Sequence, residues 1–358
     1  MMATADDKSV EASALAETGV IEIVRGGPDV GGGSTVRAKP ALVEVDGLTK
    51  HFPLKRQSPF AARRVVRAVD NLSFSIPRGT TVGLVGESGC GKSTVARLLL
   101  RLITATSGSV RFDGQEVFAA GRREMILLRR NMQMVFQDPF SAFNPRMSVG
   151  DIISEPLRVH GMAARADKRV HDLLDLVGLS RQHASRYPHE FSGGQRQRIG
   201  IARALAVNPT FIVCDEAVSA LDVSIQSQIL NLLKDLQSEL GLTYLFISHN
   251  LSVIKYICDF VGVMYLGRLV EWADKRTLFS APNHPYTKAL LSAIPVPRPG
   301  YRKDMVRLEG DLPSPINPPP GCTFHTRCNV AMGMCSQTEP RLRDISARHM
   351  SACLLNES

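Results

Sequence analysis

The sequence contains no apolar run of the roughly 18 residues that a membrane-spanning helix needs, and its N-terminus lacks the apolar h-region of a secretory signal peptide. Because both features are missing, we expect a cytoplasmic protein that reaches a membrane only through partners. Aromatic residues make up only 6% of the chain and the arginine pairs are scattered, so a net charge of +9 does not indicate a base-stacking surface. We therefore expect no nucleic-acid partner.

The chain also lacks an internal repeat, and its 358 residues are enough for about two or three domains. Residues 1–40 contain glycine-rich stretches with little to pack, which predicts disorder. From 41 to 275, β-branched strand patterns alternate with helical patterns, which predicts an α/β domain with a substantially parallel sheet. Within it we expect a helical subdomain at about 144–190. Residues 276–358 form an extension with many prolines and four of the seven cysteines.

One stretch fits the phosphate-binding loop pattern G-x-x-x-x-G-K-[ST], with an apolar strand pattern before it and an amphipathic helix pattern after it. Its glycines let the backbone aim several N–H groups at one anion, and the helix start adds its own free N–H groups. In this pattern the lysine reaches the β- and γ-phosphates and the serine hydroxyl holds Mg²⁺. The alternative, a chance glycine-rich turn, does not account for the flanking elements. The loop residues are Gly86, Glu87, Ser88, Gly89, Cys90, Gly91, Lys92 and Ser93.

An apolar strand pattern ends in two adjacent carboxylates, Asp215 and Glu216. After a phosphate-binding loop, an Asp at such a strand end holds Mg²⁺. The neighbouring Glu can then polarise an attacking water molecule as a general base. Alone, the pattern marks only a strand that meets solvent. Its position about 120 residues after the loop makes it a credible partner of that loop.

A second anion-binding pattern lies between these two motifs. Ser192 can cap the helix that follows it, and the next two glycines expose backbone N–H groups at the helix start. The alternative is an ordinary capped helix with a glycine-rich entry. The stretch consists of Ser192, Gly193, Gly194 and Gln195.

That stretch, placed between the two other motifs, resembles the signature of ATP-binding cassette (ABC) ATPases, and order and spacing agree throughout. The resemblance implies an α/β P-loop NTPase fold of the ABC type with a helical subdomain. It also implies further site residues: Phe52 stacks on adenine, Gln137 contacts Mg²⁺ and the attacking water, Asp222 lies in the D-loop, and His249 contacts the γ-phosphate.

By the same resemblance, two such domains face each other head to tail, and each ATP lies between the loop of one and the signature of the other. The loop from Gly86 to Thr94 wraps the phosphates. Mg²⁺ is organised by Ser93, Gln137 and Asp215. The catalytic groups are Glu216, His249 and Gln137.

Further stretches are similar to the ATPase subunits of oligopeptide and dipeptide importers, and the match covers roughly residues 41 to 353. The resemblance implies a peripheral ATPase at the cytoplasmic face of the membrane, with a paralogous second ATPase, two permeases and an extracytoplasmic solute-binding protein as partners. Import of nickel, sugars or other solutes, and a soluble non-transport ATPase, stay open as alternatives. Two residues depart from the family pattern, Ala217 and Phe191. The similar stretches are 137–146, 187–192, 217–224, 284–287 and 312–322.

Four cysteines crowd into the last forty residues, and in a cytosolic chain such a cluster points to metal more than to disulfides. They lack the C-x₂₋₄-C pairs of zinc sites, and relatives with this tail resemble carriers of a [4Fe–4S] cluster. We rank [4Fe–4S] first, zinc second and free thiols third. A regulatory metal-binding protein is the rival to the ATPase, and the complete hydrolysis set argues against it. The expected ligands are Cys322, Cys328, Cys335 and Cys353.

Overall fold

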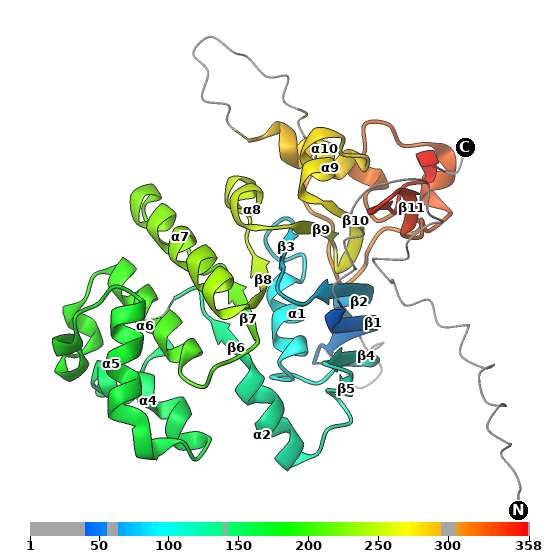
Figure 1. The fold of residues 1–358 in the computed structure, drawn as a ribbon. Helices are drawn as coiled ribbons and strands as arrows, with labels where there is room; N and C mark the ends of the chain where they lie inside the picture. Colours follow the sequence, from blue (N-terminus) through cyan, green and yellow to red (C-terminus); the bar gives the residue numbers. More distant parts are fainter. Residues whose placement is uncertain (1–39, 56–63, 139–141, 295–305, 307, 357–358) are drawn as a thin grey trace, which may run out of the picture.

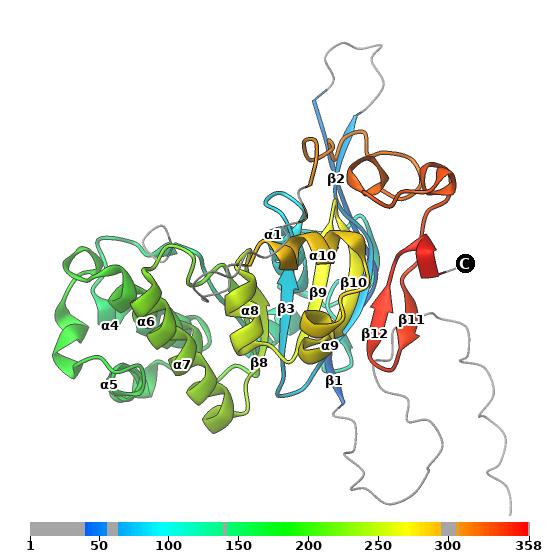
Figure 2. The same cartoon turned by 90° about the horizontal axis from the view of Figure 1, so that it is seen from above.

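The computed structural model describes residues 40–55, 64–138, 142–294, 306 and 308–356 as two sheets, a helical lobe and a C-terminal extension (Figure 1). Figure 2 shows the helical lobe on one side of the sheets and the C-terminal strands on the other. The disorder predicted for residues 1–40 lies outside the described residues except at Pro40, whose carbonyl accepts the Arg78 N–H at 3.0 Å. Among the described helices, none is long and apolar enough to cross a membrane.

The main sheet has eight strands in the order β11-β12-β10-β9-β3-β8-β7-β6. Strands β6, β7, β8, β3 and β9 pair in parallel, whereas the last three strands pair antiparallel. Strands β3, β7 and β8 are buried throughout, as expected for strands covered on both faces. The strands are β3 (Thr81–Val85), β6 (Met132–Val135), β7 (Phe211–Asp215), β8 (Thr243–Ile247), β9 (Phe260–Tyr265), β10 (Arg268–Asp274), β11 (Arg343–Ser346) and β12 (His349–Ser351).

A second, antiparallel sheet has the order β2-β1-β4-β5 and was not predicted from the sequence. Its strands are β1 (Ala41–Pro53), β2 (Val65–Pro77), β4 (Ser107–Phe112) and β5 (Gln115–Glu116). The β1–β2 pairing shifts register at several bulges, which breaks the strict alternation that identifies a half-buried strand. Its inner face shares a hydrophobic core with β3 and β7, where Phe112 packs against Phe211 at 6.2 Å between ring centroids.

The helices cover the main sheet and build the separate helical lobe. Helix α1 buries Val95 and Leu98 in the core between the two sheets. The helices are α1 (Lys92–Leu99), α2 (Arg122–Asn131), α4 (Val149–Val159), α5 (Ala166–Leu176), α6 (Gly193–Leu205), α7 (Val223–Leu240), α8 (Leu251–Ile257), α9 (Lys275–Ser280) and α10 (Pro285–Ser292). Short 3-10 helices lie at Ala163–Arg165, Arg181–Ser185, Pro188–Glu190, His325–Arg327, Gly333–Ser336 and Leu354–Asn356.

Helices α4 and α5 of the helical lobe lie within the range of about 144–190 where we expect a helical subdomain. Helix α6 packs on both α4 and α5 and therefore belongs to this lobe, and it also contacts α7 beside the sheet. The C-terminal extension is likewise continuous with the main sheet, because Trp272 of β10 pairs with Met350 of β12. The C-terminal extension thus completes the edge of the main sheet.

A buried carboxylate ties the extension to the sheet. Glu271 is fully buried and accepts hydrogen bonds from the backbone N–H groups of Asn283 (2.7 Å) and His284 (2.9 Å), and His349 Nε2 lies 2.7 Å from it. Burial raises the pKa of Glu271, but these hydrogen bonds outweigh burial and hold it below its ordinary value. Because both carboxylate oxygens have partners, this buried charge fixes where α10 and β12 dock.

The neighbouring His284 makes the folded protein sensitive to acid. Burial lowers its pKa from 6.5 to about 4, and its Nδ1 accepts the Tyr286 N–H at 3.1 Å, which caps α10. Below pH 6.5 the unfolded chain binds a proton at this histidine that the folded chain does not bind, so stability present above that pH is lost as the pH falls toward 4.

The variant His284→Asn keeps a capping oxygen but cannot titrate. We expect its free energy of unfolding, from chemical denaturation, to fall less over this range than the wild type's; parallel curves would contradict the assignment.

Candidate functional site

The predicted phosphate-binding loop connects β3 to α1 at the carboxyl edge of the main sheet. Two close approaches demand glycine: a Cβ on Gly86 would lie 2.2 Å from the Met264 carbonyl oxygen, and one on Gly91 would lie 2.1 Å from that of Ala68. Gly91 also has a φ of 107°, in the left-handed region. The loop is therefore held against β9 and β2 in a conformation that other residues would strain.

Lys92 extends its amino group back into this loop. Its Nζ donates to the carbonyl oxygens of Gly86 (2.7 Å) and Glu87 (2.9 Å) and lies 3.7 Å from the Cys90 sulfur. The side chain is almost fully buried. A buried positive charge at the centre of a ring of backbone groups is a binding position for phosphate oxygens.

Ser93 and Asp215 lie 122 residues apart in the chain and meet here, with the Ser93 hydroxyl donating to Asp215 Oδ1 at 3.0 Å. Burial and the charge of Glu216 raise the pKa of Asp215, while this hydrogen bond opposes the shift. A hydroxyl and a carboxylate at this distance are a donor set that suits Mg²⁺, which prefers oxygen ligands. The structure thus brings together two of the three predicted Mg²⁺ residues.

Glu216 follows β7 in the left-handed region, with a φ of 49°, which is uncommon for a residue with a side chain. Its N–H donates to the Ile247 carbonyl at 3.0 Å, and its Oε1 lies 3.3 Å from His249 Nδ1. The backbone of the next strand therefore holds the predicted base in this conformation, beside the predicted switch histidine. Ala217, which stands where the family has proline, is buried directly after it.

The signature residues begin α6. Ser192 accepts the Gln195 N–H at 3.4 Å, and Gln195 Oε1 accepts the Ser192 N–H at 3.0 Å, which forms a capping box. Ser192 and Gly193 are exposed. Figures 1 and 2 both place α6 in the helical lobe, away from α1 and its loop. Asp222 caps the next helix by accepting the Ile225 N–H at 2.9 Å.

Two predicted residues, Phe52 and Gln137, stand apart from this arrangement. Phe52 lies at the end of β1, 37% exposed, with Lys50 Nζ 5.0 Å from its ring centroid. Gln137 is exposed, two residues after the end of β6. Within the described part of the chain, neither is hydrogen-bonded to the phosphate-binding loop.

Sequence reasoning missed two residues of the extension that touch this loop. Tyr286 accepts the Glu87 N–H at 2.9 Å, and Arg327 pairs with the Glu87 carboxylate at 3.0 Å. Tyr286 lies within a stretch already similar to importer ATPases, which offered a weak signal. Arg327 lies in no recognised pattern, so only the fold reveals its contact.

The four C-terminal cysteines lie close enough for their charges to influence one another. Each sulfur accepts a backbone N–H, that of Phe324, Val330, Met332 or Leu355. Burial raises the pKa of Cys322 to about 11. Yet among the residues that the structure describes, no three His, Cys, Asp or Glu side chains are arranged around a single metal ion.

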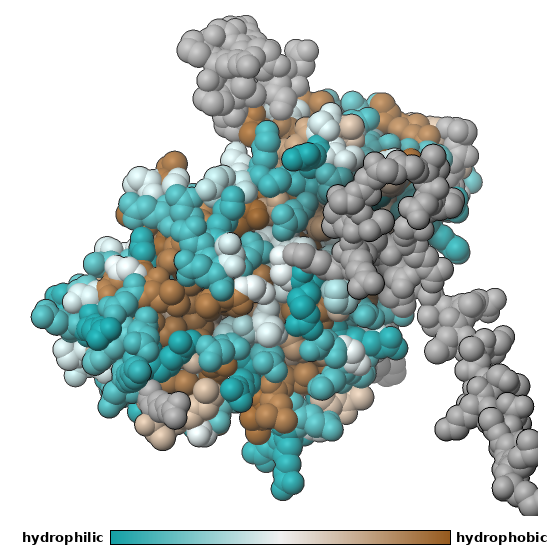
Figure 3. Space-filling view, in the orientation of Figure 1, coloured by the Kyte–Doolittle hydropathy of each residue, from teal (hydrophilic) through white to brown (hydrophobic). Residues whose placement is uncertain are grey.

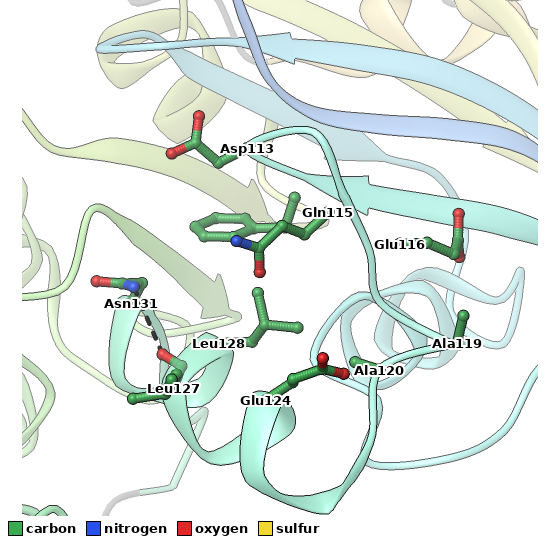
Figure 4. A pocket seen from close by; sticks show the side chains of 10 residues that line it. Asp113, Gln115, Glu116, Ala119, Ala120, Glu124, Leu127, Leu128 and Asn131 are labelled. Carbon is green, nitrogen blue, oxygen red and sulfur yellow. Dashed lines mark hydrogen bonds between the residues drawn. The ribbon is translucent and has the colours of Figure 1, made fainter.

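A hollow of about 520 Å³ between β4–β5 and α2 does not belong to this site (Figure 4). The carboxylates of Asp113, Glu116 and Glu124 line it beside Leu127 and Leu128. Three carboxylates would repel a phosphate, so the hollow does not compete with the loop as a nucleotide site.

The close packing of the signature helix generates a prediction. A Cβ on Gly194 would lie 2.4 Å from Ile225 Cγ2, whereas one on Gly193 would meet its nearest atom, in Leu221, at 3.4 Å. We expect Gly194→Ala to force α6 away from α7 and to lower the free energy of unfolding by about 1–3 kcal/mol. The matched variant Gly193→Ala should change it by less than about 1 kcal/mol. Thermal and chemical denaturation measure both, and equal effects would rule out the packing argument.

Comparisons with known proteins agree with this geometry. The profile of the family described as "ABC transporter" matches residues 69–219, and that of "Oligopeptide/dipeptide transporter, C-terminal region" matches residues 270–335. A protein of Brucella ovis named as a peptide import ATP-binding protein is 52% identical over 315 residues, which is 87% of this chain and 97% of that protein. The oligopeptide transport ATP-binding protein AppF of Bacillus subtilis is 49% identical over 328 residues, which is 90% of this chain and 99% of AppF.

A solved structure, that of the ATP-binding cassette MJ0796 as a dimer bound to ADP and Pi, superimposes with a TM-score of 0.58 at 27% identity, covering 65% of this chain and 99% of that one. The predicted P-loop NTPase fold of the ABC type is thereby confirmed. The chain therefore belongs to the ABC transporter family as an ATP-hydrolysing cassette subunit, in the branch that carries the oligopeptide/dipeptide transporter C-terminal region.

Proposed function

We propose that this ATPase drives the uptake of dipeptides or oligopeptides as the ATP-hydrolysing subunit of an ABC importer at the cytoplasmic face of the membrane. The peptide cargo is supported by the match of residues 270–335 to the oligopeptide/dipeptide transporter region and by the peptide transport role in the name of AppF. Import of nickel or a sugar, or a non-transport ATPase, would need a different partner set from the same catalytic core.

One observation carries the ATPase chemistry: two pairs of groups, Ser93 with Asp215 and Glu216 with His249, meet at one sheet edge beside the loop. In this proposal the loop from Gly86 to Thr94 binds the phosphates, and Lys92 neutralises their charge. Mg²⁺ would be held by Ser93, Asp215 and Gln137. Glu216 accepts a proton from the attacking water, His249 contacts the γ-phosphate, and Phe52 stacks on adenine.

A second ATPase subunit completes each site in this proposal. Ser192 and Gly193 are exposed at the start of α6, which lies in the helical lobe away from the chain's own loop, so this helix start can face a nucleotide held by another chain. Asp222 lies nearby at the start of α7 and would face the same partner. We propose a paralogous chain as that partner, because importers of this type often pair two different ATPases.

The membrane partners are two permeases and an extracytoplasmic solute-binding protein. On the face shown in Figure 3, apolar side chains gather between the helical lobe and the sheets, and Val159 of α4 is 69% exposed. The apolar surface between the lobe and the sheets supports contact with a permease there. The Gln137 segment, which joins β6 to this lobe, would transmit opening and closing to that permease.

For the four C-terminal cysteines we propose a [4Fe–4S] cluster, with zinc as the alternative. The donor set is four thiols near one another, each accepting a backbone N–H. Burial raises the pKa of Cys322, Cys328 and Cys353, and these hydrogen bonds oppose that rise. Tetrahedral zinc needs all four sulfurs about 2.3 Å from one ion. A four-iron cluster binds each sulfur at a different iron and therefore suits thiols that are gathered but do not converge. Its role would be to hold the extension in shape.

The catalytic assignment predicts a loss of hydrolysis without a loss of binding. Replacing Glu216 with Gln removes the proton acceptor but keeps the shape, so kcat for ATP should fall by at least about a hundredfold. Affinity for ATP should stay within about threefold. The control Glu239→Gln removes an exposed carboxylate at the far end of α7 and should retain full hydrolysis. Unchanged turnover in Glu216→Gln would overturn the assignment.

The same preparations test the cargo. The complete complex in proteoliposomes should take up labelled di- and oligopeptides with ATP inside, and the Glu216→Gln complex should not. Uptake of nickel or a sugar in place of peptides would overturn the peptide assignment while leaving the ATPase intact.

The cysteine proposal predicts about four iron and four sulfide atoms per chain after anaerobic purification. The double variant Cys328→Ser/Cys335→Ser should lose both, whereas Cys258→Ala, which removes a buried thiol of the sheet core, should keep them. One zinc per chain without iron would establish the alternative, and absence of any metal would overturn both.

A further inference from the structure

The C-terminal extension reaches the phosphate-binding loop and grips a single residue of it. Arg327, in the 3-10 helix His325–Arg327, donates from one terminal nitrogen to both carboxylate oxygens of Glu87, at 3.0 and 3.1 Å. The side chains are only 9% and 25% exposed. An ion pair this well shielded is much less weakened by water and salt than a surface pair.

A second contact holds the backbone of the same residue. The Glu87 N–H donates to the hydroxyl of Tyr286 at 2.9 Å, and Tyr286 is fully buried. Its ring packs against Tyr265 (4.8 Å between centroids) and Phe324 (5.4 Å). Phe324 and Tyr286 belong to the extension and Tyr265 to β9, so this aromatic cluster joins two parts of the extension to the sheet at one point.

Glu87 also contacts Lys92, the loop residue expected to bind the β- and γ-phosphates. The carbonyl of Glu87 accepts from Lys92 Nζ, so the N–H, the carbonyl and the carboxylate of Glu87 are all held. A loop whose backbone is held in place before the phosphates arrive loses less entropy on binding. Among the described residues, the cation that pairs with the Glu87 carboxylate is Arg327, which the extension supplies.

From these contacts we infer that Arg327 and Tyr286 are positioning residues for ATP binding, and that the extension is a working part of the nucleotide site. They act by holding Glu87, and through it the loop and Lys92, and they need not touch the nucleotide. The inference rests on the proposed function, because it presumes that this loop binds ATP. It assigns the extension a role beyond any cluster that its cysteines hold.

The coupling between the C-terminal extension and ATP binding at the loop must be reciprocal. If the extension stabilises the loop for ATP, then ATP must stabilise the extension by the same factor. Hydrogen exchange should therefore slow in the segment around 322–336 when ATP binds to the complete complex, and the slowing should be lost when the ion pair is removed.

The test compares Arg327→Gln, Glu87→Gln and the double variant in the complete complex. Each single variant should raise the KM for ATP by about tenfold, as expected for loss of a hydrogen-bonded charge pair, while kcat changes by less than about twofold. The double variant should be no worse than the poorer single variant, because both remove one interaction. Arg327→Lys keeps the charge and should recover part of the affinity.

Matched control variants distinguish a specific effect on ATP binding from a general loss of folding. Arg341→Gln removes an exposed arginine of the same extension that lines a hollow beside Asp70 and Asn71, and it should leave KM unchanged. Tyr286→Phe removes only the hydroxyl that accepts the Glu87 N–H and should also raise KM. Iron content should match the wild type in Glu87→Gln, whose change lies outside the extension.

The outcomes are distinguishable. A wild-type complex without ATP hydrolysis would overturn the proposed function itself. An active wild type with unchanged KM in folded Arg327→Gln and Glu87→Gln would overturn this inference alone. So would strictly additive effects in the double variant, or ATP protection of the extension that persists without the ion pair.

Discussion

Strands β3, β8 and β7 lie side by side in parallel register, so that Leu84 and Asp215 both lie opposite Ile247. Because the three strands end at one edge, the segments that follow them meet there. These segments are the phosphate-binding loop, the Glu216 turn and the His249 turn. A slip of one residue in the β7–β8 pairing would turn Asp215 away from Ser93 and separate Glu216 from His249. The chemistry of the site therefore depends on backbone register in the buried sheet.

Buried polar groups determine how the extension attaches to this core. Glu271 uses its charge to hold α10 and β12, and Arg327 uses its charge to hold Glu87 of the loop. A buried charge that loses its partner is costly, so such pairs permit one docking arrangement and penalise shifted ones. The extension is bound to the ATPase through specific polar contacts at both ends, with an aromatic cluster between them.

Several parts of the fold and site were predictable because they rest on short-range patterns. The residues from Gly86 to Ser93 carry their own glycines, lysine and helix start, and Ser192 with Gln195 forms the capping box that local spacing predicts. The antiparallel sheet of β1, β2, β4 and β5 escaped prediction because its bulges interrupt the alternation. The contacts of α6 with α4 and α5 arise from tertiary packing, which local pattern does not reveal.

The sequence by itself determined the fold family, the loop and the residue types available for hydrolysis, because each is encoded within a few neighbouring positions. Only the tertiary structure decided which of these groups meet. Ser93 finds Asp215 across 122 residues and Glu87 finds Arg327 across 240, and nothing local specifies either partner. The physical reason is that strand order and the docking of the extension, which arise from burial over the whole chain, set the distances between groups that the sequence keeps far apart.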